Sequence, residues 1–387
     1  MSAAADEVTA LLAELIGIDT TSSGSNLELI DFARGLCDPL GLATTVQPSP
    51  AGQKANLIIT APDVHGRRTG GAVLWGHTDT VPTTGQPWAS DPYEARFADG
   101  RVYGRGTADM KGFLACALSL LPRLATMRLR EPVRVVLSYD EELWCRGAAQ
   151  LVPVLAAEDR PIELCLVGEP TGMRLVRAHK SGTVGRLRVS GIAGHSSDPD
   201  AGVNAIGVAS DFVQLLERLA RELRAEPEPG FAVPFSTINV GTIAGGIATN
   251  IVAADCELSW ELRTVRPEHV RQVLDAVEGH VAAVNARLSE HHPGARLAHE
   301  VSAHVPGLQP AALPPWLEDA IDAESSPHVA FGTEAGLLCA AGIPAVVCGP
   351  GNISEAHIAD EYVEISQLEE CRESLIRLID ALTDDAE

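Results

Sequence analysis

The sequence predicts an α/β protein in which a mostly parallel sheet is sandwiched by helices and a smaller α+β domain is inserted. Short apolar, β-branched segments alternate with segments of helical length in the first half of the chain, which is typical of strands covered by helices. This alternation stops in the middle of the chain and returns near its end. A chain of 387 residues also exceeds the usual size of one hydrophobic core, so two domains are expected.

The larger domain is expected to comprise residues 1–178 and 294–387. Its helices are amphipathic, and its strands are short runs of aliphatic residues that end at polar or glycine-containing turns. The predicted elements, in order, are helices at 6–17 and 26–40, strands at 56–60 and 72–75, a helix at 112–125, and strands at 133–138, 164–167 and 344–348.

The inserted domain is expected to span residues 179–293. The segment 183–190 alternates apolar and polar residues, which predicts a half-exposed strand rather than a fully buried one. The elements that follow are a helix at 203–224, strands at 237–240 and 255–263, and a helix at 269–288. This β-α-β-β-α order is typical of a small α+β domain.

The composition excludes several classes of function. The chain has 29 Lys and Arg against 52 Asp and Glu, a formal net charge of −23. Such a surface repels nucleic-acid phosphates and anionic lipid, so we expect neither a nucleic-acid nor a membrane partner. The first residues carry acidic side chains where a signal peptide needs basic ones. Eight cysteines without framework spacing are expected to be free thiols, which suggests a cytoplasmic protein.

Metal-type ligands follow several of the predicted strands. His77 and Asp79 come directly after one strand, and Glu169 comes directly after another. Open α/β sheets place their ligand sites beyond the carboxyl ends of the strands, so these side chains are expected to meet. The candidate set is His77, Asp79, Asp109, Glu142, Glu169 and His357.

Imidazole nitrogens and carboxylate oxygens suit zinc, cobalt or manganese, and no thiolate is needed. A carboxylate that bridges two ions is the general design of two-metal hydrolytic sites. The set therefore predicts a hydrolase with two divalent ions, with Zn²⁺ expected and Co²⁺ as a possible substitute.

His77 and Asp79 are two residues apart at a strand end, so in extended geometry their side chains face the same way. A ligating imidazole usually donates its other N–H to a carboxylate, which makes Asp79 the candidate partner. A lone His-x-Asp pattern is more often structural than catalytic. The remaining ligands are what favour a site.

Glu141 stands directly before the candidate ligand Glu142, just after an apolar strand. Neighbouring side chains on an extended segment point apart, so Glu141 is free to take a proton from the attacking water. An acidic turn of this kind is normally solvated. Its place at the end of a buried strand favours a catalytic role here.

The ordered motifs resemble those of the acetylornithine deacetylase and succinyl-diaminopimelate desuccinylase branch of the zinc aminoacylase/carboxypeptidase family, and they lie closest to its acetylornithine deacetylase side. The resemblance runs nearly end to end. It is carried by GHTDTVP, GRGTADMKGF, DEE, VGEPT, RAHKSG, GHSSDP, GVNAI, GGIATNIV, GTEAG and GPGNISEAHIADEY.

The resemblance implies a zinc-exopeptidase-like catalytic domain with a ferredoxin-like lid domain through which two chains form a homodimer. It further implies that His77 and Glu169 hold one ion, that Glu142 and His357 hold the other, and that Asp109 bridges them before a cis peptide bond to Met110. Glu141 is then the base and Asp79 steadies His77. In the inserted domain, His195 is expected to stabilise the oxyanion in the partner's site. Arg263 is expected to bind the substrate carboxylate, with Asn250, Gly332 and Thr333 also on the substrate side.

Two positions depart from the pattern of the family. Trp144 stands where relatives usually have glycine, and the turn after Arg263 has an unusual sequence. Both positions concern the substrate rather than the chemistry.

The expected reaction is therefore removal of a short acyl group from a small-molecule N-acyl amino acid, with N-acetylornithine as the leading substrate in arginine biosynthesis. A related N-acyl-amino-acid deacylase, a desuccinylase and a dipeptidase remain as alternatives, and so does a metal-binding scaffold without activity. A scaffold, however, has no need of Glu141.

Overall fold

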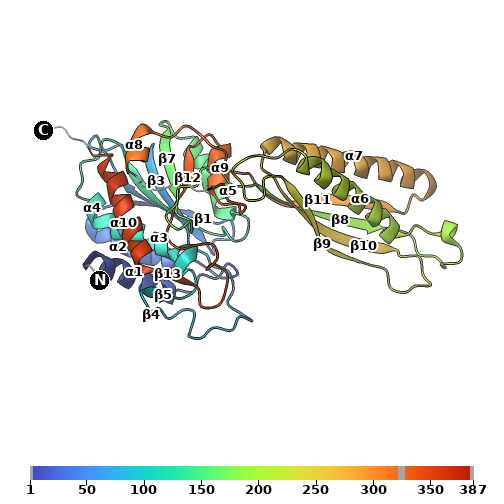
Figure 1. The fold of residues 1–387 in the computed structure, drawn as a ribbon, viewed down its shortest axis with the longest axis horizontal. Coiled ribbons are helices and arrows are strands. Elements are labelled where there is room, and N and C mark those ends of the chain that lie inside the picture. Colours follow the sequence, from blue (N-terminus) through green and yellow to red (C-terminus); the bar gives the residue numbers. More distant parts are fainter. Residues whose placement is uncertain (1–2, 321–326, 384–387) are drawn as a thin grey trace. The chain divides into compact units, whose positions relative to one another are not determined.

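The computed structural model describes residues 3–320 and 327–383, and the chain divides into two compact units (Figure 1). The first unit contains Met1–Ala178, Leu308–Ser326 and Thr333–Glu387, and the second contains His179–Gly307 and Pro327–Gly332. The second unit extends past the expected boundary at 293. The reason is that Arg296–Val305 forms a strand that pairs with strand Gly182–Ser190 of the same unit.

The first unit is built on a six-stranded sheet in the order β1-β2-β6-β3-β7-β12. Neighbours β6, β3, β7 and β12 are parallel, and β2 is antiparallel to both β1 and β6, so only β2 runs in the opposite direction. The strands are β1 (Ala43–Pro48), β2 (Ala55–Ala61), β3 (Gly71–His77), β6 (Val133–Ser138), β7 (Ile162–Val167) and β12 (Ala345–Val347). The mostly parallel sheet expected from the sequence is confirmed.

Helices cover this sheet. Every residue of β3 and β6 is buried, which requires covering layers on both faces. Helices α1, α3 and α10 pack against one another, and α5 packs against α9. The helices are α1 (Ala3–Gly17), α2 (Leu27–Cys37), α3 (Gly112–Ser119), α4 (Leu121–Leu124), α5 (Arg146–Ala156), α8 (Pro315–Ala320), α9 (Ala335–Ala340) and α10 (Ile365–Asp380), with a 3₁₀ turn at Asp38–Leu40.

A small antiparallel sheet in the order β13-β5-β4 was not expected from the sequence. Its strands, β4 (Arg96–Ala98), β5 (Arg101–Tyr103) and β13 (Tyr362–Glu364), have three residues each, too few for a clear alternating pattern. The pairing of β5 with β13 joins two segments that carry candidate ligands, because Asp109 follows β5 and His357 precedes β13.

The second unit has the β-α-β-β-α-β order of a ferredoxin-like domain. Its antiparallel sheet has the order β11-β8-β10-β9, and its helices pack on the sheet around a core that includes Phe212 and Trp260. The elements are β8 (Gly182–Ser190), α6 (Ala205–Arg224), β9 (Thr237–Gly245), β10 (Asp255–Arg263), α7 (Pro267–His291) and β11 (Arg296–Val305), with a 3₁₀ turn at Pro199–Ala201. Both expected helices are present.

No helix among residues 3–320 and 327–383 is long and apolar enough to cross a bilayer. All eight cysteines are free, as expected, and Cys339 is the one that is partly exposed.

Candidate metal centre

The candidate ligands gather at one edge of the large sheet. His77 is the last residue of β3, Glu141 and Glu142 follow β6, and Glu169 follows β7. These three strands are adjacent and parallel, so their carboxyl ends meet at the same edge. The next strand, β12, leads into the segment that carries His357.

One group of possible ligands consists of His77, Glu141 and Glu169, whose donor atoms all lie within 4.8 Å of one another. His77 Nε2 lies 4.0 Å from Glu169 Oε1. Two ligand atoms that are each about 2.1 Å from one zinc ion can be up to about 4.2 Å apart. The two side chains are therefore spaced to share an ion.

A second group consists of Asp109, Glu142 and His357, again within 4.8 Å. His357 Nε2 lies 2.9 Å from Glu142 Oε1 and 3.2 Å from Asp109 Oδ2. The other oxygen of Asp109, Oδ1, lies 2.8 Å from His77 Nε2 in the first group. The carboxylate of Asp109 thus stands between the two histidines and offers one oxygen to each group.

Asp109 lies in the irregular turn Thr107–Lys111, which begins at left-handed Gly106 and leads into α3. The peptide bond from Asp109 to Met110 is cis, as the resemblance implied. The segment is well buried, and Asp109 is 6% exposed.

Asp79 contacts His77 differently from the expected arrangement. His77 Nδ1 lies 2.9 Å from the main-chain carbonyl oxygen of Asp79, while the nearest carboxylate oxygen is 3.7 Å away. The carboxylate instead accepts hydrogen bonds from the backbone N–H groups of Glu141 at 3.0 Å and Glu142 at 3.3 Å, and from the Ser22 hydroxyl at 2.8 Å. Asp79 therefore fixes the acidic turn with its side chain and orients His77 with its backbone.

Glu141 and Glu142 belong to different ligand groups, but not because they lie on an extended segment. They form a turn that begins at Asp140, whose φ is +54°. Trp144 and Cys145 also have left-handed backbones, with φ of +69° and +54°. Glycine adopts this conformation without cost, so the geometry at Trp144 fits the glycine that the resemblance led us to expect there.

The carboxylates of the two groups repel one another. Burial raises the pKa of Glu141 well above the usual range, and the negative charge of Glu169 raises it further. Burial likewise raises the pKa of Glu169, and the negative charge of Asp109 adds to the shift. Burial and the charge of Asp109 also raise the pKa of Glu142. Hydrogen bonds to Asp109 and Glu142 raise the pKa of His357 to about 10. The cluster therefore attracts positive charge strongly.

Glu169 Oε1 is buried and accepts no hydrogen bond from the described residues. A buried carboxylate oxygen without a partner is costly, and a cation supplies the missing interaction. The donor set of imidazole and carboxylate groups is the set that Zn²⁺ or Co²⁺ binds. The residues of both groups fit divalent ions.

Glu334 is a further buried acid at this site whose role was not apparent from the sequence. It is fully buried, and its Oε2 accepts hydrogen bonds from Trp75 Nε1 at 2.6 Å and from the Ser138 hydroxyl at 2.9 Å. Burial raises its pKa to about 7, although the positive charge of His77 opposes the shift. The only sequence signal was its place in the GTEAG motif beside Thr333, which is also buried.

His195 and Asn250 lie on adjacent segments of the second unit. His195 forms a β-bridge with Ile251, and the backbone N–H of Ser196 donates to the carbonyl of Asn250 at 3.1 Å. Both side chains are exposed, and His195 Nδ1 lies 2.7 Å from the Ser197 hydroxyl. The structure thus brings these two expected functional residues together within one unit.

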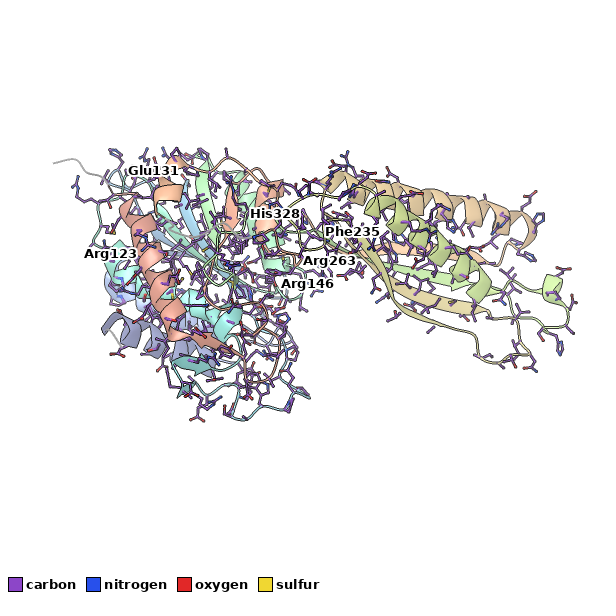
Figure 2. The ribbon with its side chains drawn as sticks, in the orientation of Figure 1. Arg123, Glu131, Arg146, Phe235, Arg263 and His328 are labelled. Atoms are coloured by element: carbon purple, nitrogen blue, oxygen red, sulfur yellow. The ribbon has the colours of Figure 1, made fainter. Side chains whose placement is uncertain are left out.

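Arg263 is the last residue of β10 and pairs in register with Thr237 at the start of β9; Phe235 is close by in the chain (Figure 2). Its Nε donates to Glu261 Oε1 at 2.8 Å. Gly332 belongs to the same unit and lies close to the Arg263 guanidinium. Lys180, which the sequence analysis did not single out, is buried nearby and donates to the Phe235 carbonyl at 2.7 Å. Burial and the positive charge of Arg263 lower the pKa of Lys180.

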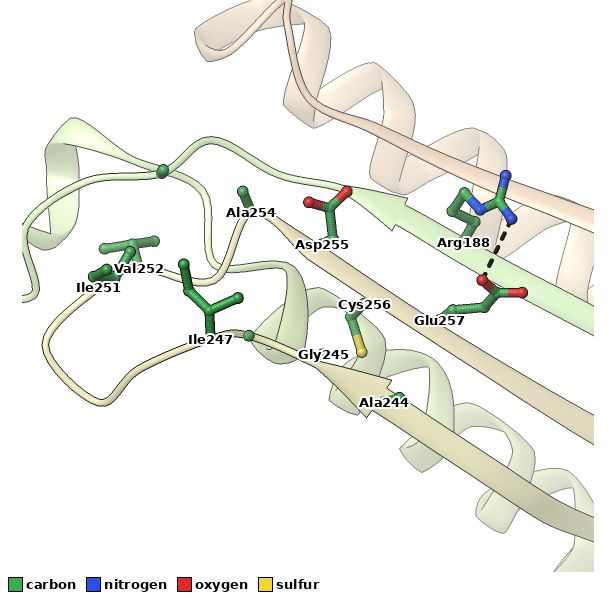
Figure 3. Close-up of a pocket in the computed structure, with 12 residues that line it drawn as sticks. Arg188, Ala244, Gly245, Ile247, Ile251, Val252, Ala254, Asp255, Cys256 and Glu257 are labelled. Atoms are coloured by element: carbon green, nitrogen blue, oxygen red, sulfur yellow. Dashed lines mark hydrogen bonds and ion pairs between the residues drawn. The ribbon is translucent and has the colours of Figure 1, made fainter.

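An apolar pocket lies beside the His195 segment in the second unit (Figure 3). Ile247, Ile251 and Val252 line it together with residues of β9 and β10, and an ion pair between Arg188 and Glu257 borders it. Ile247 is 88% exposed. A large aliphatic side chain this exposed beside an apolar pocket is typical of a surface that binds another protein.

Comparisons with known proteins agree with this geometry. Residues 73–381 match the model of peptidase family M20/M25/M40. The chain is 34% identical over 366 residues to the acetylornithine deacetylase of Proteus mirabilis (strain HI4320), covering 94% of this chain and 92% of that relative. Among solved structures, aminopeptidase PepT of Bacillus cereus superposes with a TM-score of 0.75 at 20% identity, over 98% of each chain. The YXEP protein of Bacillus subtilis, a dinuclear metal binding peptidase, gives 0.66 at 13% identity, over 98% of this chain and 99% of that one.

Proposed function

The chain belongs to peptidase family M20/M25/M40, and on this premise we propose that it removes the acetyl group of N-acetylornithine, giving ornithine and acetate in arginine biosynthesis. The observation that carries the proposal is the pair of ligand groups joined by Asp109, with the carboxylate of Glu141 inside the first group. The name of the relative from Proteus mirabilis supports the choice of substrate.

In this proposal His77 and Glu169 would hold one divalent ion, Glu142 and His357 would hold the other, and Asp109 would offer one carboxylate oxygen to each group. The 4.0 Å spacing of His77 and Glu169 and the 2.9 Å contact of His357 with Glu142 support the assignment. Zinc is the proposed ion and cobalt a substitute, because the donors are nitrogen and oxygen.

Bound ions of this kind polarise the amide carbonyl and lower the pKa of water. Glu141 takes the proton of the attacking water and returns it to the departing amine. Its backbone N–H is held by Asp79, which keeps the carboxylate at the site. Burial and the negative charge of Glu169 raise the pKa of Glu141, which suits a group that must both accept and donate a proton.

The second unit supplies substrate contacts in this proposal. Arg263 binds the carboxylate of the amino acid, a task suited to a planar donor with several N–H groups. Asn250 and Gly332 of this unit are also assigned to the substrate side, as is Thr333, which belongs to the first unit. His195 stabilises the negative charge that develops on the amide oxygen.

Substitution of Glu141 by glutamine tests the base. Turnover should fall by at least about a hundredfold, because general acid–base catalysis contributes on this scale. The metal content, measured by elemental analysis, should be unchanged, since the assigned ligands are intact. Retained turnover in Glu141→Gln would remove Glu141 from the mechanism.

The substrate is tested with metal-loaded protein and a panel of N-acetyl, N-succinyl and N-formyl amino acids together with dipeptides. N-acetylornithine should have the highest kcat/KM. Preference for a dipeptide or a succinyl amino acid would replace the proposed substrate by one of the alternatives. A protein that binds metal but hydrolyses none of the panel would be a scaffold.

We also propose that the protein is a homodimer whose two chains meet through β9. We propose in addition that it is located in the cytoplasm. Strand β9 is an edge strand of the sheet, is mostly exposed, and has no charged residue and no proline. Such an edge pairs readily with another strand. Ile243 is exposed on it, and the pocket of Figure 3 continues the apolar surface to Ile247. The opposite edge, β11, carries Arg296 and Glu300 instead. Eight free cysteines fit a reducing compartment.

Ile247→Glu should shift the protein from dimer to monomer in analytical ultracentrifugation, because it places a charge in the apolar contact. Val301→Glu, an exposed position on β11, is the matched control and should leave the dimer intact.

In addition, mixing inactive His195→Ala and Glu141→Ala chains should regenerate part of the activity if His195 serves the partner's site. A monomeric wild type would refute the dimer.

A further inference from the structure

Glu361 lies just before β13 and is 1% exposed, yet it is not among the candidate ligands. Its carboxylate accepts hydrogen bonds from three backbone N–H groups of the segment that contains Asp109. Oε2 accepts from Gly106 at 3.0 Å, and Oε1 accepts from Ala108 at 3.0 Å and from Asp109 itself at 3.1 Å. One buried side chain therefore fixes the backbone on which the bridging carboxylate is mounted.

Arg105 is the fourth donor to Glu361. Its Nη1 donates to Glu361 Oε2 at 2.6 Å, and the guanidinium is 1% exposed. Four donors and no acceptor surround the carboxylate, as expected for an ionised group. The two side chains are buried and joined by this hydrogen-bonded ion pair, so breaking it leaves an uncompensated charge in the interior.

Arg105 also connects this pair to the segment of His357. Its Nη1 donates to the Ile358 carbonyl at 3.4 Å, and its Nη2 donates to Gln86 Oε1. Gln86 Nε2 in turn donates to the carbonyl of His357 at 2.9 Å. A continuous network thus runs from the backbone of Asp109 through Glu361, Arg105 and Gln86 to the backbone of His357.

His357 needs such support more than the other ligands do. Its side chain is 48% exposed and its φ is +64°, whereas His77 ends a fully buried strand and Glu169 follows a mostly buried one. His77 and Glu169 of the first group stand at strand ends, and Glu141 and Glu142 share the turn after β6. Asp109 and His357 of the second group stand on irregular segments, and the network joins these two.

We infer that the buried Arg105–Glu361 pair, extended by Gln86, is a positioning device that holds Asp109 and His357 in register and so sets the affinity of the second ion. This inference rests on the proposed two-ion site. Residues behind the ligands of a metal typically change its affinity by about 10- to 100-fold, so a selective loss of this size is expected when the network is broken.

The test compares Glu361→Gln and Gln86→Ala with Glu364→Gln. Glu364 is the matched control, because it pairs with Arg101 at 3.3 Å between β13 and β5, its side chain is only half-buried, and its ion pair involves neither ligand segment. The chain is stripped of metal and titrated with Co²⁺. Stoichiometry is measured by elemental analysis and the two sites are followed by the visible absorption of bound cobalt.

Wild type and Glu364→Gln should bind two ions. Gln86→Ala should keep the first affinity and bind the second ion at least about tenfold more weakly. Glu361→Gln should weaken the second ion by at least this factor and the first ion less, because Asp109 contacts both ligand groups. Gln86 is only partly buried, so Gln86→Ala decides the matter if Glu361→Gln fails to fold.

The possible failures are distinguishable. A wild type that binds a single ion defeats the two-ion proposal itself. Two ions bound with wild-type affinity by the folded variants overturn the inference while leaving the two-ion proposal intact. An equal loss of both ions also overturns it, because that is the result of a general structural defect.

Discussion

At the residue scale, the carboxylates of the site differ in role according to what each contacts. Asp79 accepts three hydrogen bonds and offers its backbone carbonyl to His77, so it acts as a support. Asp109 contacts both histidines with its two oxygens. Burial and hydrogen-bond partners, rather than residue type, separate these roles.

Glu334 gives a prediction at this scale. Its folded-state pKa of about 7 lies above the value of an exposed glutamate, so the carboxyl is substantially protonated near neutral pH before metal binds. Glutamine keeps an acceptor for Trp75 and Ser138 without adding charge. Glu334→Gln should therefore raise the free energy of unfolding of the metal-free protein at pH 7, because the wild type must take up a proton at Glu334 on folding and glutamine need not.

Glu334→Ala is the contrasting variant. It leaves the indole N–H of Trp75 and the hydroxyl of Ser138 buried without their acceptor, and each such loss costs about 1–3 kcal/mol. Urea unfolding at pH 7 should show a clear loss of stability for alanine. Equal effects of glutamine and alanine would contradict this account.

The pH dependence of the same group has a definite sign. Because the folded chain binds a proton at Glu334 that the unfolded chain has released, its contribution to stability falls as pH rises from about 4.5 through about 7. Metal-free Glu334→Gln should lack this component when its unfolding is compared with wild type at pH 5 and pH 7. An identical pH profile in the two proteins would show that Glu334 is ionised throughout.

At the element scale, the site depends on close contact between strand ends and α3. Gly168 follows β7 and precedes Glu169, and a Cβ atom there would lie 1.9 Å from Cγ of the Phe113 ring on α3. Phe113 is fully buried and cannot move aside freely. Only glycine at position 168 allows the segment after β7 to place Glu169 this close to α3.

Gly168→Ala should therefore destabilise the protein by about 1–3 kcal/mol, the usual cost of overpacking a core. The substitution should also lower the affinity for the first metal ion, because Glu169 is displaced. Gly207→Ala on α6 is the control, since a Cβ atom there meets only the Cβ of Asn204 at 4.0 Å. Thermal unfolding and Co²⁺ titration measure both effects, and wild-type behaviour of Gly168→Ala would show that Phe113 adapts.

At the scale of the whole molecule, the two units are expected to respond differently to acid. Burial lowers the pKa of four histidines of the second unit, and that of His179 falls to about 4. The four are His179, His280, His299 and His304. The unfolded chain binds protons at these groups from about pH 6.5 downward, whereas the folded chain binds them only at lower pH. The second unit should lose stability as the pH falls from 7 to 5.

Hydrogen exchange, corrected for intrinsic rates, checks this at the level of peptides. From pH 7 to pH 5, protection should fall more in β8, β10 and β11 than in β3, β6 and β7. The double variant His280→Phe and His299→Phe removes two titrating rings and retains aromatic contacts with Phe212, so it should reduce the difference. Equal loss of protection in both units would contradict the prediction.

The sequence determined the elements of both units where their patterns are long. The buried strands β3, β6 and β7 and the long helices α6 and α7 were all expected, because apolar periodicity over many residues reflects burial directly. His77, Glu142 and Glu169 were expected at the edge of the sheet and lie there, since residues at the carboxyl ends of adjacent parallel strands meet at one edge. The three-residue strands β4, β5 and β13, the edge strand β1 and the late strand β11 were not predicted.

Only the tertiary structure decided which atoms meet. A backbone carbonyl orients His77, and Glu334 lies buried behind the site. Glu361 holds the backbone of Asp109 from 252 residues away in the chain. These contacts depend on how the whole chain packs. Local sequence encodes secondary structure and burial, which are set by neighbouring residues. The pairing of buried polar groups is set by the packing of whole elements, and no local pattern contains it.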